Sequence, residues 1–544
     1  MSGGGLMQLV AYGAQDVYLS GNPQITFFKV VYRRHTNFSV EPIQQTWNGA
    51  ADFGRTVTCN INRNGDLITN MYVAVKLNAQ PAGGAAWGYV NRLGHAMIES
   101  VKIEIGGSKV DEQYGDWLNI WYELTHKSGQ VRGYSKMIGD VSEITGVNSN
   151  ATDAYQMYVP LQFWFNRNNG LALPLIALQY HDVRVTLKFR DALACVNFAG
   201  TTAPVLNNLM ADSYLLIDYV YLDSEERKRF AQASHEYLIE QLQFTGSESL
   251  TAASNKYRLN FNHPSKYLIW APHLERHMNR TKWVSYAFDG NWAAARDRFA
   301  KVVACACSPN VQIAGDLKIF TTSNAITAIG DLVEPSRSIA GLFGKFEVKF
   351  VAQNSVAALG SVQIADSIAN LLENAIVTRN DLTMEDMSNT IDQLIALGAN
   401  GPVLNAYALN VVDYHNYGNF IDGSNNPVIN AKLQLNGHDR FQARDGNYFN
   451  YVQPAQHFSN TPADGINVYS FALRAEDHQP TGTCNFSRID NATLQVDCGM
   501  NNAASSTYVS RFIGSSSNSV VNIYTQNYNV LRVMSGMAGT AYSN

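Results

Sequence analysis

The clearest polar constellation in the sequence is Asn436-Gly437-His438-Asp439-Arg440, which follows an apolar run. An imidazole beside a carboxylate and a guanidinium could carry acid–base chemistry. The same residues could form a turn, since Asn-Gly supplies turn dihedrals and Asp439 and Arg440 could satisfy backbone groups or each other. No nucleophile elbow or second carboxylate motif accompanies the segment, so we interpret it as a turn.

A second polar segment, Glu476-Asp477-His478, offers two carboxylates and an imidazole. Adjacent side chains point in divergent directions on most backbones, so proximity in sequence does not by itself make a site. The chain contains no H-E-x-x-H, G-x-S-x-G, Walker loop or G-x-G-x-x-G, which are the short signatures of metal, acyl, phosphoryl and dinucleotide chemistry. We therefore expect no enzyme, with no catalytic, metal or cofactor-binding residues and no cofactor.

The six cysteines are scattered, with no C-x-x-C pair and no clustering with histidine. They are Cys59, Cys195, Cys305, Cys307, Cys484 and Cys498. Disulfide frameworks belong to small secreted chains, and metal sites need ligands grouped at characteristic spacings. We predict reduced and mostly buried thiols, with Cys305 and Cys307 on one face of a strand as small core residues rather than a thiolate site.

Five Asn-x-Ser/Thr sequons are possible acceptors of N-linked glycans. They begin at Asn37, Asn150, Asn279, Asn485 and Asn491. The first residues show neither the basic start and apolar core of a signal peptide nor a myristoylation motif, so we expect synthesis in the cytosol. In that compartment an unmodified asparagine is the simpler interpretation of each sequon, and glycosylation stays an open alternative.

Composition and charge disfavour two classes of protein. The 544 residues are 46% hydrophobic and 16% charged, with a formal net charge of −5. A slightly acidic chain lacks the positive field that releases counterions from a phosphate backbone, so we expect no direct sequence-specific binding of nucleic acid. No stretch of 18 uninterrupted apolar residues occurs, so we expect no membrane-spanning segment.

Alternation of polar and apolar residues is the commonest pattern, and it predicts strands. Val183, Val185, Leu187 and Phe189 alternate with polar neighbours, and Gly106-Gly107 can supply the positive φ angles of a hairpin turn. Further strands are expected at Leu67–Leu77, Tyr214–Leu222, Tyr257–Phe261, Ala431–Leu435, Ile466–Arg474 and Ala492–Cys498. The sequence therefore predicts an all-β fold.

Helical patterns are few and short. Trp117, Ile120, Trp121 and Leu124 recur at the spacing of one helix face, which predicts an amphipathic helix that packs against the core. The same spacing recurs in two more apolar stripes, the second preceded by a possible capping box at Thr383. These stripes are Ile364, Ile368, Leu371 and Leu372, and then Met387, Ile391, Leu394 and Ile395. We interpret them as a helical insertion.

The charge run Asp223–Phe230 predicts a solvated helical connector, in which Asp223 can cap the first turn and Glu226 can reach back to it. It separates two β-rich halves. We expect an N-terminal arm at 1–24, a first sandwich at 25–222, the connector at 223–235 and a second sandwich at 236–544. The second half is the longer, so we place an enlarged loop insertion at about 273–430.

Several segments, in the same order along the chain, resemble one family. They are Gly4–Leu19 (GGLMQLVAYGAQDVYL), Gly21–Lys29, Tyr32–Arg34, Asn64–Ile68, Tyr89–His95, Tyr114–Trp117, Glu225–Phe230 with Ser234–Ile239, Leu435–Phe441, His478–Pro480 with Gly482–Asp490, and Asn529–Arg532 through Asn544. They resemble the major capsid proteins of nucleocytoplasmic large DNA viruses, most closely the algal-virus and mimivirus-like branch.

This resemblance implies a double jelly roll, made of two eight-stranded antiparallel sandwiches that lie side by side. It further implies homotrimers that act as pseudo-hexagonal capsomers of an icosahedral virion shell. Expected partners are other copies, neighbouring capsomers, and minor capsid and penton proteins. The shell would lie close to an internal viral membrane without spanning it, and the protein would be made in the host cytoplasm.

A carbohydrate-binding or carbohydrate-cleaving β-sandwich protein is the alternative from another class. Tyr and Trp in loops could line a sugar-binding face, and Glu476 and Asp477 could act as paired carboxylates. Sandwich cores and protein interfaces use the same aromatic residues, so these features do not distinguish the two readings. A trimer without affinity for glycans would favour the capsid reading.

Overall fold

The computed structural model describes residues 3–81, 87–145, 151–198, 203–274, 286, 426–498 and 518–542, together with short strands between 313 and 413. Both predicted helical stripes at 364–395 lie outside the described residues, as do Cys305 and Cys307. The short strands are β15 (Ile313–Ala314), β16 (Lys318–Phe320), β17 (Ile326–Ala328), β18 (Phe346–Ala352), β19 (Leu404–Asn405) and β20 (Tyr407–Asp413).

Two antiparallel sheets build the first lobe. One has the order β1-β11-β3-β7 with β8 beside β3, and the other the order β2-β9-β5-β6. Their strands are β1 (Phe38–Thr46), β2 (Thr56–Asn60), β3 (Leu67–Leu77), β5 (Ile98–Ile105), β6 (Ser108–Tyr114), β7 (Tyr155–Pro160), β8 (Leu173–Pro174), β9 (Val183–Phe189) and β11 (Met210–Leu222), and a separate pair joins β4 (Trp87–Tyr89) to β10 (Val196–Phe198).

The second lobe repeats this plan. Its sheets have the orders β12-β27-β14-β24, with β25 and β28 at the side, and β13-β26-β21-β22, with β23 beside β21. The strands are β12 (His235–Ser249), β13 (Ser254–Arg258), β14 (Pro264–His273), β21 (Val428–Leu435), β22 (His438–Asp439), β23 (Arg444–Asp445), β24 (Asn467–Ser470), β25 (Cys484–Asn485), β26 (Ala492–Cys498), β27 (Val520–Met534) and β28 (Met537–Thr540).

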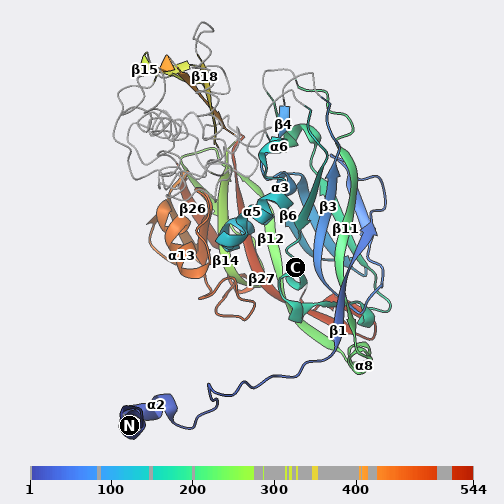
Figure 1. Cartoon of the computed structure of the whole chain (residues 1–544), viewed down its shortest axis with the longest axis vertical. Coiled ribbons are helices and arrows are strands. Elements are labelled where there is room, and N and C mark those ends of the chain that lie inside the picture. Colours follow the sequence, from blue (N-terminus) through green and yellow to red (C-terminus); the bar gives the residue numbers. More distant parts are fainter. Residues whose placement is uncertain are drawn as a thin grey trace.

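In each lobe the first strand pairs with the last long strand, and the second strand pairs with the one before it. The pairs are β1 with β11 and β2 with β9 in the first lobe, and β12 with β27 and β13 with β26 in the second. A chain folded double and rolled in this way is a jelly roll. The two lobes lie side by side (Figure 1), so the expected double jelly roll is confirmed.

The alternating pattern read from the sequence forms the core of the first lobe. Val183, Val185, Leu187 and Phe189 all point inward and are at most 2% exposed. The Gly106-Gly107 turn has φ angles of +58° and +81°, as the predicted hairpin requires. The second lobe has its own core, in which Leu494 and Val496 of β26 pack against Trp270 of β14.

Helices are short and lie mainly between strands. The predicted helix at 117–124 is confirmed as α4 (Gly115–Thr125), and the connector contains α8 (Ser224–Gln232). Asp223 takes the N-cap position of α8, but its side chain makes no cap hydrogen bond, so the predicted capping box does not form. The other elements are α1 (Gly4–Val10), α2 (Val17–Ser20), α3 (Leu93–Ala96), α5 (Val131–Met137), α6 (Ser142–Thr145), α7 (Trp164–Arg167), α13 (Gln453–His457), the π-helix η8 (Tyr448–Val452), and the 3-10 turns η1 (Ala14–Asp16), η2 (Ser128–Gln130), η3 (Asn169–Leu171), η4 (Leu175–Ala177), η5 (Ala192–Cys195) and η9 (Phe486–Arg488).

One predicted strand is shorter than expected. The sequence pattern extends over Ile466–Arg474, whereas β24 ends at Ser470. The Ser470 hydroxyl donates to the Ala472 carbonyl at 2.7 Å and accepts from the Ala472 amide at 3.2 Å. The Phe471 and Ala472 amides both donate to the Lys266 carbonyl of β14, at 2.9 and 3.2 Å, so two residues face one and the regular pairing ends here.

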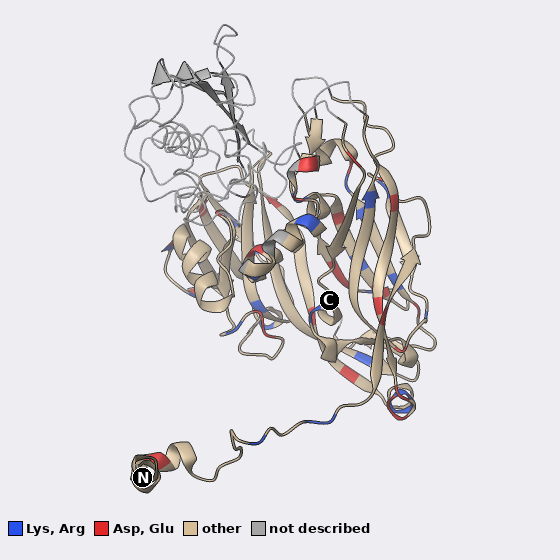
Figure 2. Cartoon of the chain, viewed as in Figure 1, with Lys and Arg blue, Asp and Glu red and all other residues tan. Residues whose placement is uncertain are grey.

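Residues 3–37 stand apart from both lobes. Residues 3–37 are exposed almost throughout, and the chain leaves the body as an extended arm that ends at α1 and α2 (Figure 1). Large apolar side chains are exposed here, among them Phe27 at 89% and Phe28 at 98%. On the lobes themselves, Lys and Arg are interspersed with Asp and Glu (Figure 2).

Candidate functional site

The segment 436–440 is a turn, as its Asn-Gly pair predicts. Asn436 and Gly437 have φ angles of +50° and +81° and join β21 to β22. Asp439 accepts a hydrogen bond from Gln434 and pairs with Lys432, each at 2.8 Å. Hydrogen bonds from Lys432 and then Gln434 lower the pKa of Asp439. The aspartate is therefore a structural partner within its own sheet.

The segment 476–478 places its three side chains against three different partners. Glu476 accepts a hydrogen bond from the Ser459 hydroxyl at 2.7 Å, and Asp477 pairs with Arg474 at 3.1 Å. His478 instead turns inward, and its Nδ1 lies 3.4 Å from the Glu240 carboxylate. The three neighbouring side chains therefore do not form a site together. His478 belongs instead to a buried cluster around Glu240, which the sequence did not predict.

The cysteines of the described residues are free thiols. Cys59, Cys195 and Cys498 are buried, and Cys484 is half-buried. Burial raises the pKa of the Cys59 thiol to about 11 and that of the Cys195 and Cys498 thiols to about 12. Such groups are protonated and unreactive at neutral pH, which agrees with the prediction of reduced and mostly buried thiols.

Three of the five sequon asparagines lie among the described residues, and all three are exposed. Asn37 lies in the arm, Asn485 in β25 and Asn491 just before β26. Asn485 accepts a hydrogen bond from the Ser487 amide at 3.0 Å, and Asn491 accepts one from the Thr493 hydroxyl at 3.3 Å. Asn150 and Asn279 lie outside the described residues.

The most elaborate arrangement of functional interest is the junction between the two lobes. Helix α4 of the first lobe packs on the outer face of the β12-β27-β14-β24 sheet of the second. The residues buried together are Trp117, Ile120, Trp121 and Leu124 from α4, with Tyr267, Ile269, Ala271, Val468 and Tyr524 from the sheet. The helix face predicted from spacing therefore does pack against a core, and that core lies between the lobes.

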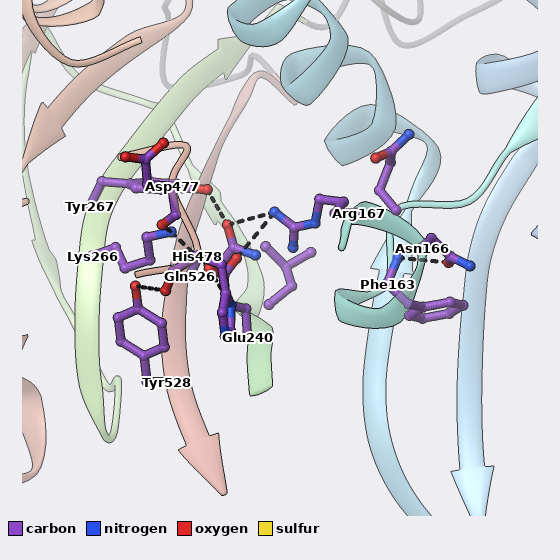
Figure 3. Close-up of polar contacts among 12 residues, drawn as sticks. Phe163, Asn166, Arg167, Glu240, Lys266, Tyr267, Asp477, His478, Gln526 and Tyr528 are labelled. Atoms are coloured by element: carbon purple, nitrogen blue, oxygen red, sulfur yellow. Dashed lines mark hydrogen bonds and ion pairs between the residues drawn. The ribbon is translucent and has the colours of Figure 1, made fainter. Parts of the chain in front are cut away.

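A buried ionic cluster lies beside this apolar contact (Figure 3). The Glu240 carboxylate of β12 is 5% exposed and contacts Arg167 of the first lobe at 3.2 Å and Lys266 of β14 at 2.9 Å. The Arg167 guanidinium also stacks 4.5 Å from the ring centre of Trp121. One carboxylate thus holds two cations from different lobes.

In the Glu240 cluster, the cost of burying the carboxylate is offset by the cations and the hydrogen-bond donor around it. Burial alone would raise the pKa of this carboxyl, but Arg167, the His478 hydrogen bond and Lys266 together lower the pKa to about 2. Burial is also the main reason why the pKa of Lys266 is lowered. The carboxylate is ionised at neutral pH because its surroundings supply the charges and donors that water no longer does.

Strands β6 and β12 meet edge to edge at the same junction. Asp111 on β6 accepts the Leu242 amide of β12 at 3.0 Å, and Gln241 of β12 donates to the Val110 carbonyl. Asp111 is 3% exposed, and burial raises its pKa to about 6 against the opposing effect of its hydrogen bonds. The contact covers an edge of each lobe that would otherwise be open to another strand.

A second buried ion pair anchors the end of α4. Arg92 pairs with Glu123 of α4, and its Nε lies 4.0 Å from Asp140. Glu123 in turn accepts the Ala463 amide of the second lobe at 3.1 Å. Arg92 has a φ angle of +51°, a left-handed conformation unusual for a residue with a side chain. Such a conformation persists when the surrounding contacts fix it.

The C-terminal hairpin crosses back to the first lobe. Leu531, Val533 and Ala538 of β27 and β28 are buried in the first lobe's core. The Tyr180 amide donates to the Gly536 carbonyl at 2.9 Å, and the Ala538 amide donates to Nδ1 of His181 at 3.1 Å. The two lobes are therefore joined by the connector, by α4 of the first lobe, and by the β27–β28 hairpin of the second lobe, which packs into the first.

These contacts join the two lobes through apolar packing, buried ion pairs and hydrogen bonds. Among the described residues there is no group of three or more His, Cys, Asp or Glu side chains placed to hold a metal ion. The helices of the described residues include none long and apolar enough to cross a membrane. The junction therefore connects the two lobes through contacts from both of them.

Comparison with known proteins identifies the family to which this two-lobed chain belongs. The family model for the large eukaryotic DNA virus major capsid protein matches residues 226–539, and the model for the major capsid protein N-terminus matches residues 26–223. The chain belongs to this family. The family predicted from the sequence motifs is therefore confirmed. The predicted location, the capsid shell of the virion, is confirmed with it.

Relatives in this family align with nearly the whole chain. The major capsid protein of Phaeocystis pouchetii virus is 43% identical over 99% of this chain and 100% of its own length. Capsid protein 1 of Acanthamoeba polyphaga mimivirus is 41% identical over the same shares. A quasi-atomic model of the PBCV-1 virus capsid superposes with a TM-score of 0.62 at 32% identity, covering 95% of this chain and 100% of the other.

Proposed function

We propose that the protein is a non-enzymatic capsid subunit that associates as a homotrimer, and that its six lobes form a pseudo-hexagonal capsomer of an icosahedral shell. The observation that carries the proposal is the repetition of one strand order in two lobes of a single chain. Three copies of a two-lobed body present six similar edges under closed threefold symmetry. Hexagonal tiling is then achieved with identical chains.

The same proposal covers the division of the chain and its surroundings. Residues 1–24 act as an arm beneath the capsomer, 25–222 and 236–544 as the two jelly rolls, and 223–235 as their connector. Neighbouring capsomers, minor capsid proteins and penton proteins are the partners, and an internal viral membrane lies close by. Exposed Asn37, Asn485 and Asn491 are the candidate glycan acceptors within the described residues.

The carbohydrate-active alternative finds little support in the structure. Each tryptophan of the described residues is buried or half-buried, so these residues offer no exposed indole platform for a sugar. Glu476 and Asp477 are engaged by Ser459 and Arg474 rather than facing each other across a cleft. Paired carboxylates that cleave a glycosidic bond need to flank their substrate.

Light scattering on the purified full chain tests the proposal. We expect a particle of three times the chain mass of 60.1 kDa, stable on dilution and without affinity for immobilised glycans. Electron microscopy of assembled particles should show a six-lobed outline for each capsomer. A monomer that binds sugars would overturn the proposal in favour of the alternative.

A further inference from the structure

The outer face of the second lobe's first sheet is covered by the first lobe. Two rows of side chains cross this face, Leu242-Gln526-Tyr267-Ser470 and Phe244-Tyr524-Ile269-Val468. Tyr267, Ile269 and Tyr524 are at most 1% exposed because α4 lies on them. Within the chain, an apolar sheet face of one lobe is thus sealed by the helix that follows the β6 strand of the other.

The corresponding sheet of the first lobe carries an equivalent face. Its rows are Gln44-Leu216-Tyr72-Pro160 and Thr46-Tyr214-Ala74-Tyr158. Leu216, Tyr72, Tyr214 and Tyr158 keep part of their surface exposed, whereas Leu215, one position away and facing inward, is fully buried. Tyrosines and a leucine on a partly exposed sheet face form a surface suited to a protein partner.

The second lobe carries a counterpart to α4. Its strands β22 and β23 are followed by η8 and α13, as β6 is followed by α4, and in both lobes the next strand belongs to the other sheet. Tyr448, Val452 and Ala455 recur at four- and three-residue spacing, like Trp117, Trp121 and Leu124 on α4. Val452 is 41% exposed, Ala455 is exposed and Tyr448 is half-buried.

The two surfaces lie on opposite sides of the two-lobed body. In Figure 1, α13 lies at the outer left of the second lobe, and β3 and β11 lie at the outer right of the first, with the intramolecular junction between them. The same kind of helix and the same kind of sheet that meet inside the chain therefore also lie on its two opposite sides. Such an arrangement suits head-to-tail association.

We propose that the η8–α13 segment of one copy packs on the β1-β11-β3-β7 face of the next copy, and so repeats between chains the contact that α4 makes within a chain. The inference rests on the proposed function, to which it adds the interacting surfaces. A heterologous contact closes into a ring when its rotation divides the circle. With three chains, intramolecular and intermolecular junctions alternate around six lobes.

Single charged substitutions on either surface test the inference. Val452→Glu places a carboxylate on the helix side, and Leu216→Glu places one on the sheet side. Because an unpaired charge is costly to bury, each variant should shift from the three-chain to the one-chain mass at equal concentration, with unchanged circular dichroism. The control is Leu9→Glu, since Leu9 is a 78% exposed residue of the arm, outside both surfaces. It should remain trimeric.

Mixing the two variants gives a sharper readout. The Val452→Glu chain keeps an intact sheet face, and the Leu216→Glu chain keeps an intact η8–α13 segment, so one good contact can form between them. Chemical cross-linking of the equimolar mixture should capture a two-chain species of twice 60.1 kDa that neither variant gives alone. Its absence, or either variant remaining trimeric, would overturn the inference. If the unmodified chain were not a trimer, the proposed function itself would fail instead.

Discussion

At the scale of single residues, the junction depends on buried charges whose partners come from the other lobe. Glu240 is the clearest case, since it holds Arg167 from the first lobe and Lys266 from its own sheet. Burying an ion pair contributes little net stability, but removing one partner leaves the others uncompensated. The role of such a residue is therefore best seen when it is removed.

Glu240→Gln should destabilise the protein strongly. The substitution keeps the size of the side chain but removes the carboxylate charge that pairs with both Arg167 and Lys266, at a cost of about 3–5 kcal/mol. Urea unfolding followed by tryptophan fluorescence measures it, since Arg167 stacks on Trp121. Glu236→Gln is the matched control, because the Glu236–Arg532 pair is 60% and 55% exposed and should contribute less than about 1 kcal/mol. Equal effects of both variants would contradict this account.

Asp111 should make stability depend on pH in the opposite sense from most carboxylates. Its folded pKa is raised from 3.8 to about 6, so the unfolded chain loses its proton first as the pH rises. The contribution of Asp111 is then most favourable below pH 3.8, falls between pH 3.8 and 6, and stays constant above.

The variant Asp111→Asn removes this titration. Relative to the unmodified chain, it should gain on the order of 1–3 kcal/mol between pH 4 and pH 7, and nothing further at higher pH. Parallel urea titrations of both proteins at several pH values measure the difference. A difference that does not change with pH would mean that Asp111 does not titrate in this range.

At the scale of elements, α4 is the piece that joins the lobes, and its start is tightly fitted. A Cβ atom at Gly115 would lie 2.1 Å from the His95 carbonyl oxygen and 2.3 Å from that of Ile98. Backbone atoms cannot move aside as a side chain can. Only glycine therefore lets α4 begin directly at the end of β6.

Gly115→Ala should displace α4 and lower the thermal unfolding temperature by several degrees, because the clash affects the whole helix that packs on the second lobe. Gly133→Ala in α5 is the control, since nothing lies within 4 Å of a Cβ there. That substitution should be neutral, or stabilising by up to about 1 kcal/mol, because alanine favours a helix. Calorimetry of both variants separates the clash from helix propensity.

The sequence predicted individual elements better than their contacts. The alternation at Val183–Phe189, the apolar spacing at Trp117–Leu124 and the turn at Asn436 depend on local rules, and each took the expected form. The Glu240 cluster could not be predicted in this way. Arg167 and Glu240 are far apart in sequence, and neither belongs to a recognisable motif. Only the packing of the two lobes brings them together. His478 was the sole visible hint.

At the scale of the whole molecule, the arm is the part without a role in the lobes. Since residues 3–37 are largely exposed, deletion of residues 1–24 should leave the thermal stability and the trimer mass unchanged. Shell assembly should be impaired, because the exposed apolar side chains of the arm are then missing as contacts for neighbouring proteins. Sizing and electron microscopy of assembly reactions measure both effects. Normal particles formed by the truncated chain would contradict the assignment.

The β27–β28 hairpin makes completion of the first lobe depend on residues that are synthesised after the second lobe's other strands. Leu531 and Val533 fill a core whose other residues come almost entirely from the first 220 positions. On the ribosome, the first lobe is synthesised early but lacks these side chains until the chain has been made as far as β27 and β28. A nascent or prematurely terminated chain that lacks β27 and β28 therefore carries an unfinished first lobe, and only a chain that includes both strands can complete it.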